Sequence, residues 1–151
     1  MIFEFGRYTI DVDIEKTKEF YSSSLAVRTD EACSCHRCQN FSGAIMTSSR
    51  LVLDFLRGLG VDPQKAEEVC GALGDCEETV GYLGWYPIVG TLLKGRVEGK
   101  VYNESNAFLP DSNSEFMFWF EDDRSKMGWI NKNFPSPVLE ISFSAVLPNN
   151  K

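Results

Sequence analysis

The stretch LEISFSAVL, residues 139–147, sets the fold, because its apolar and polar side chains alternate. Leu139, Ile141 and Phe143 fall in one phase, and Glu140 falls in the other. Successive side chains of a strand point to opposite faces of a sheet, so the pattern predicts a strand with one buried face. That face needs other apolar elements of the chain to cover it.

A continuously apolar run, FMFWF at residues 116–120, predicts a central strand that is covered on both faces. The covering helix is expected earlier, where Val52, Phe55, Leu56 and Leu59 recur at helical spacing. We therefore expect this helix face to pack against the sheet that contains the two strands.

Capping residues predict where two of the helices begin or end. Asp13 is expected to cap a helix that extends to about residue 22, and the hydroxyls of residues 47–49 are expected to cap the next long helix. Gly60 fits the left-handed position that closes a helix, with Val61 supplying the accompanying apolar contact.

The remaining elements are predicted from periodicity and turn residues. The expectations are a strand over residues 3–12 with a bulge at Gly6-Arg7, a helix over 35–46, a helix from Asp62-Pro63 to residue 73 or a short helix passing into a strand, strands over 80–98 and 101–109, and a helix over 123–131. Early helices and late strands predict a single α+β domain over residues 1–151, with helices packed on one face of a mainly antiparallel sheet.

The charge balance argues against one class of partner. The chain of 151 residues has a formal net charge of −7, from 15 Lys and Arg against 22 Asp and Glu. Nucleic-acid affinity comes largely from neutralised phosphates, so no nucleic-acid binding is expected, and a basic protein is the better partner. No apolar stretch approaches the roughly 20 residues that span a bilayer, and no signal peptide is visible, so we expect no membrane association.

Three of the five cysteines crowd into CSCHRC, residues 33–38. Crowded thiols suit a reducing compartment, which predicts a cytoplasmic protein. Cys35 and Cys38 have the Cys-x2-Cys spacing of zinc sites, and Cys33 offers a third ligand. The fourth ligand would come from His36, Cys70 or Cys76.

The same cysteines permit two other interpretations. Cys35 and Cys38 at a helix start could perform thiol redox chemistry, because helix amides lower a thiol pKa. Alternatively, the thiols are inert, and no cofactor is bound. Carboxylates at Asp11 and Asp13 and at residues 121–123 offer a less supported acid–base or cation site.

The block Cys33-x-Cys35-x2-Cys38-x-Asn40-Phe41 is the most specific of several motifs, and the others are residues 9–13, 16–18 with Tyr21, 55–62, 84–90 and 134–138. In these motifs the chain resembles an uncharacterised family of small cytoplasmic proteins from Gram-positive anaerobic bacteria. The resemblance implies a stand-alone bacterial domain and no catalytic residue.

These observations favour a non-enzymatic binding or interaction protein of immunity-like or regulatory type, with oligomeric state unspecified. The alternative is a cysteine-cluster protein that binds zinc or performs redox chemistry through Cys33, Cys35 and Cys38. A hydrolase or transferase that uses carboxylates is the third hypothesis.

Overall fold

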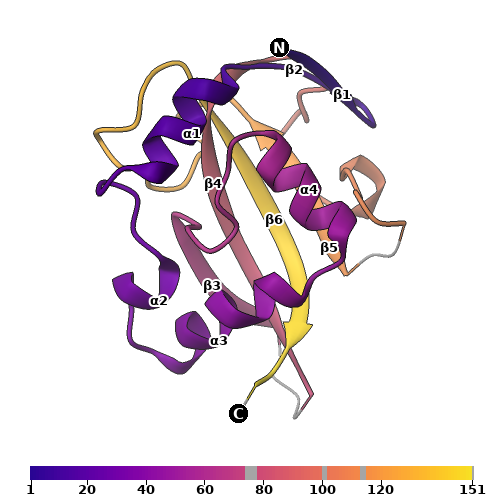
Figure 1. Cartoon of the computed structure of the whole chain (residues 1–151). Coiled ribbons are helices and arrows are strands. Elements are labelled where there is room, and N and C mark those ends of the chain that lie inside the picture. The colour runs from indigo at the N-terminus through magenta and orange to yellow at the C-terminus, as the bar shows by residue number, and fades with distance from the viewer. Residues whose placement is uncertain (74–77, 100–101, 113–114, 151) are drawn as a thin grey trace.

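The computed structural model describes residues 1–73, 78–99, 102–112 and 115–150 (Figure 1). None of the helices in these ranges is both long and apolar enough to cross a membrane. The elements in chain order are β1 (Ile2–Phe5), β2 (Tyr8–Val12), α1 (Ile14–Ser22), α2 (Thr29–Ala32), α3 (His36–Ala44), the 3₁₀ turn η1 (Ile45–Thr47), α4 (Arg50–Gly58), β3 (Glu68–Leu73), β4 (Thr79–Lys94), the 3₁₀ turn η2 (Glu104–Asn106), β5 (Phe116–Glu121) and β6 (Val138–Pro148).

The sheet is organised around the long strand β4. Along the sheet the order is β1-β2-β4-β6-β5, and every one of these described pairings is antiparallel. β6 runs along one edge of β4, from Thr79 opposite Pro148 to Val89 opposite Val138. The other edge is divided, because β2 pairs with residues 90–94 and β3 pairs with residues 81–85. The predicted α+β class with a mainly antiparallel sheet is confirmed.

The helices cover one face of this sheet, which we call the helix face (Figure 1). The Phe55 ring of α4 lies 4.6 Å from the Phe118 ring of β5, measured between centroids. Val52, Leu56 and Leu59 are buried with it, so the predicted packing of α4 on β5 is confirmed. Each fully buried side chain of this size contributes about 1.5–3 kcal/mol from removal of apolar surface from water.

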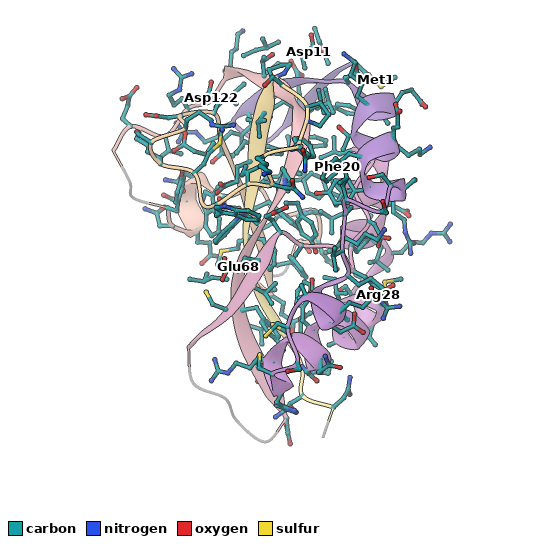
Figure 2. The ribbon with its side chains drawn as sticks, turned by 90° about the vertical axis from the view of Figure 1, so that its left-hand side faces the viewer. Met1, Asp11, Phe20, Arg28, Glu68 and Asp122 are labelled. Carbon is teal, nitrogen blue, oxygen red and sulfur yellow. The ribbon has the colours of Figure 1, made fainter. Side chains whose placement is uncertain are left out.

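The opposite face, which we call the loop face, is covered by irregular segments of the second half of the chain (Figure 2). The Trp85 indole N–H donates to the Trp129 carbonyl oxygen at 2.9 Å. The Trp119 indole N–H donates to the Asn106 side-chain oxygen at 2.8 Å. Polar groups of the loops thus accept hydrogen bonds from the indole N–H groups of tryptophans on this face of the sheet.

Local sequence signals place three helix ends where they were predicted. The Asp13 carboxylate accepts from the Lys16 amide at 3.0 Å, and the Ser49 hydroxyl accepts from the Val52 amide at 3.4 Å. Gly60 adopts φ +88°, the left-handed conformation that a side chain would strain.

Two predictions in the first half of the chain are wrong. Gly6-Arg7 is not a bulge but the two-residue turn of the β1–β2 hairpin, with Gly6 at φ +59°. The helix from Asp62-Pro63 does not form, because residues 68–73 instead pair with β4 and gain ladder hydrogen bonds. The alternative, a short helix that passes into a strand, is correct in the strand only, because residues 63–64 form a turn.

Three predictions in the second half also need correction. β5 is the last strand on the sheet path rather than a central one, and Phe108 forms an isolated bridge to Phe118 beyond it. The strand over 101–109 is replaced, in its described part, by η2, which Asn103 caps. The helix over 123–131 does not form, because Asp123 accepts from the Ser125 amide and hydroxyl in a single local turn at residues 124–126, and irregular chain follows.

Candidate metal centre

The three clustered cysteines lie where α2 meets α3, on the side of the sheet that carries the helices. Cys33 follows α2, Cys35 is the N-cap residue of α3, and Cys38 lies in its first turn. Their sulfur atoms lie within 4.8 Å of one another. Three thiolates bound to one zinc ion at about 2.3 Å would be about 3.8 Å apart, so the group needs small side-chain shifts to close on a metal.

The three thiols differ in exposure and in proton affinity. Cys33 and Cys35 are exposed, whereas Cys38 is buried. The backbone amide of Cys38 is the main cause that lowers the pKa of Cys35 to about 7, and the neighbouring thiols of Cys33 and Cys38 assist. Burial raises the pKa of Cys38 to about 12. Of these two thiols, Cys35 therefore loses its proton more readily, and the thiolate is the form that binds a metal or attacks a disulfide.

Gln39 fixes the loop that carries Cys33. Its side-chain amide donates to the carbonyl oxygens of Asp30, at 2.6 Å, and Cys33, at 3.1 Å. The Asp30 amide in turn donates to the Ser42 hydroxyl at 3.0 Å. These bonds join α2 to α3 and hold Cys33 over the start of α3.

Asn40 and Phe41 fasten the cysteine-bearing helix to the sheet. The Asn40 side-chain amide donates to the Tyr82 hydroxyl and to the Pro148 carbonyl oxygen, both at 3.0 Å. Its oxygen accepts from the Asn150 amide at 2.8 Å. Phe41 is fully buried and stacks on Phe143 at 5.8 Å between ring centroids. Asn40 and Phe41 thus position the cysteines.

The fourth ligand proposed from the sequence is not in the described group. The His36 ring nitrogen Nε2 lies 3.3 Å from the Asn149 side-chain oxygen, and His36 is not part of the cluster in the described ranges. Cys70 pairs with Leu83 in the β3–β4 ladder and faces away from α3, which explains why it also stays apart. Cys76 lies outside the described residues.

Of the predicted carboxylates, Asp11 and Asp13 line one pocket, and Glu121 is not among its lining residues. Asp11 pairs with the N-terminal amine at 3.0 Å, and both Asp11 and Asp13 line a pocket of about 560 Å³. Glu121 lies elsewhere, buried at the end of β5, where it accepts from the Tyr102 hydroxyl at 2.8 Å. The acidic residues thus serve as an ion-pair partner, a helix cap and a buried acceptor.

Sequence analysis missed a buried carboxyl group on the loop face. Glu140 is 4% exposed and lies opposite Glu121 in the β5–β6 ladder. It accepts from the Gly128 amide at 2.8 Å and from the Ser142 hydroxyl at 2.7 Å. Burial raises its pKa above the usual carboxyl value. The alternating pattern of β6 carried no signal for this, because Glu140 occupies the phase that usually faces water.

We compared the chain with known protein families, curated proteins and solved structures. No protein-family model, curated protein or solved structure matches the chain. The resemblance to an uncharacterised bacterial family therefore stays a prediction. The geometry of the cysteines is the basis for a proposed function.

Proposed function

We propose that this protein binds a thiophilic metal ion, with zinc as the first candidate, through Cys33, Cys35 and Cys38. The observation that carries the proposal is the mutual approach of the three sulfur atoms, within 4.8 Å. Sulfur is the preferred ligand of zinc in closed protein sites, and three thiols leave one position of a tetrahedron open. Because Cys33 and Cys35 are exposed, that position is accessible to water, to a residue of the chain or to a partner.

The proposal is tested by elemental analysis of protein purified in reducing buffer without chelator. We expect about one equivalent of zinc, lost in Cys35→Ser and in Cys38→Ser. Cys70→Ser is the matched control, because Cys70 is exposed and lies outside the cluster. A protein that retains no zinc after dialysis against a stoichiometric supply of the ion would refute the proposal.

The fourth ligand is tested by a separate variant. Cobalt(II) replaces zinc in thiolate sites and reports its coordination by visible absorption. If His36 completes the tetrahedron, His36→Ala changes the cobalt spectrum. An unchanged spectrum assigns the fourth position to water or to another residue.

The exposure of the cysteines favours a second candidate, thiol–disulfide exchange. The exposed Cys35 thiolate would attack one sulfur of a substrate disulfide and displace the other sulfur as a thiolate. Buried Cys38 would then attack the Cys35 sulfur, releasing the second substrate thiol and leaving a Cys35–Cys38 disulfide. Stoichiometric reduction of a disulfide substrate by metal-free protein, abolished by Cys35→Ser, would favour this candidate over metal binding.

An immunity-like or regulatory interaction with a basic partner remains a prediction from the net charge of −7. It is compatible with metal binding, because both describe a binding protein rather than an enzyme. Affinity capture from native cells, followed by mass spectrometry, tests whether a basic protein associates in a salt-dependent manner.

A further inference from the structure

A second pocket, which none of the clustered cysteines lines, lies between α1, the end of α4 and the residues that follow it. It has a volume of about 430 Å³, within the range of about 300–1,000 Å³ that is usual for small-molecule sites. In Figure 1 the chain leaves α4 at the end nearest α1. The lining residues are Lys18, Tyr21, Ser22, Arg57, Gly60, Val61, Asp62 and Lys65.

The lining is basic, although the protein as a whole is acidic. Lys18 of α1, Arg57 of α4 and Lys65 of the following loop contribute three cations, against the single carboxylate of Asp62. Three separate elements thus direct positive charge into one concave site. A concave site with charges of one sign focuses the field on a ligand of the opposite sign.

Among the described residues, the three cations have no carboxylate partner. In the described part of the chain, Arg28 forms an ion pair with Asp30 and Arg96 with Asp122. No ion pair within the described ranges involves Lys18, Arg57 or Lys65. No described carboxylate therefore competes with an anion from solution for these three cations.

The pocket is held in shape by close backbone contact. A Cβ atom at Gly60 would lie 2.8 Å from the Ile14 carbonyl oxygen and 3.0 Å from the Lys18 amide, so this position packs directly on α1. The Lys65 ammonium donates to the Tyr21 carbonyl oxygen at 2.7 Å. That bond fixes one cation at the pocket and leaves two of its three N–H groups for a ligand.

We propose that this pocket binds a phosphate dianion, either free or as the monoester group of a small phosphorylated molecule. Three cations and one carboxylate leave the lining with two net positive charges, which match that dianion. The Arg57 guanidinium offers the planar pair of N–H donors that suits two phosphate oxygens. The volume leaves room for an organic substituent beside the phosphate.

The test is a titration of ¹⁵N-labelled protein followed by amide NMR, with inorganic phosphate and phenyl phosphate as probes at constant ionic strength. We expect saturable shifts at Tyr21, Ser22, Gly60 and Val61. Tighter binding of phenyl phosphate identifies a phosphorylated molecule as the ligand, and equal binding identifies free phosphate. Either result supports the phosphate site.

Arg57→Gln is the deciding variant, and Arg50→Gln is its matched control at the other end of α4. Arg57→Gln should weaken phosphate binding about tenfold or more, because it removes a charged bidentate donor. Arg50→Gln should leave binding unchanged, since Arg50 is exposed and outside the pocket. The proposal is overturned if no shift saturates, or if the two variants weaken binding equally. The NMR spectrum of each variant also reports whether it is folded.

Discussion

The two faces of the sheet bury their side chains by different means. On the helix face, aromatic rings of different elements contact one another, as Phe55 contacts Phe118 and Phe41 contacts Phe143. On the loop face, hydrogen bonds from irregular segments satisfy Trp119 and Glu140. A strand that alternates in polarity can therefore be buried on both faces, provided that loops supply partners for the polar phase.

The contrast predicts different costs for truncation, and the largest belongs to the helix face. Phe55→Ala removes a ring that contacts both Phe118 and Phe5, and it should lower the free energy of unfolding by about 3–5 kcal/mol. Urea denaturation measures the change. Leu51→Ala on the same helix is the control, because Leu51 is 57% exposed and should change stability by only a few tenths of a kcal/mol. Equal effects in the two variants would contradict the described orientation of α4.

Removing a hydrogen-bond acceptor on the loop face should cost less. Asn106→Ala removes the acceptor that the Trp119 indole and the Asn103 amide share, at 2.8 and 3.0 Å, and leaves the indole with the Asn103 carbonyl oxygen at 3.2 Å. The expected loss is about 1–3 kcal/mol, because two hydrogen bonds worth about 0.5–1.5 kcal/mol each are removed. Thermal denaturation measures the loss of stability in Asn106→Ala, and Asn133→Ala is the control, because Asn133 is exposed. A neutral Asn106→Ala would mean that water replaces the lost acceptor.

A third prediction uses pH to test the same face. Because burial raises the pKa of Glu140 above its ordinary 4.5, the folded state binds more protons than the unfolded chain just above that pH. The stabilisation from this group is greatest in acid and is lost as the pH rises through the folded pKa. Each unit of elevation corresponds to about 1.4 kcal/mol.

Glu140→Gln removes this ionisation and should flatten the fall in stability from pH 4.5 toward neutrality. Denaturant titrations of both proteins across that range measure the two slopes. Burial also raises the pKa of Glu67, but that contribution is common to both proteins and cancels in their difference. Parallel profiles would show that Glu140 has the same proton affinity folded and unfolded.

The smallest effect is expected at the outer surface of the loop face. Trp129 is 67% exposed, and the bond it makes to Trp85 uses its backbone carbonyl oxygen. Trp129→Ala keeps that carbonyl and should change the free energy of unfolding by no more than about 0.5 kcal/mol. A larger loss in chemical denaturation would show that its ring supports the loop.

Several patterns confined to neighbouring residues predicted their parts of the molecule correctly. The Asp13 cap, the Gly60 stop and the apolar face of α4 each depend on a few adjacent side chains. Cys35 and Cys38 are likewise brought together by one helical turn. In these places long-range packing agrees with the local signal, so the local signal was sufficient.

Features that depend on distant pairing could not be predicted in this way. Residues 68–73 have helical spacing, yet β4 offers them a free edge and they form β3. The burial of Glu140 requires a loop amide at Gly128, and the basic pocket joins three elements. In each case the deciding partner is remote in the sequence, and no local pattern identifies it.

The pairing of β4 with β6 has a consequence for the order of folding during synthesis. Thr79 pairs with Pro148 and Val89 with Val138, so the centre of the sheet joins residues that the ribosome produces far apart in time. Such long-range contacts slow folding and delay it until the later strand has emerged. Asn40, which fastens the cysteine helix, bonds to Pro148 and Asn150. The helix that carries the cysteines is therefore fastened to the sheet through Asn40 only after translation has passed these residues.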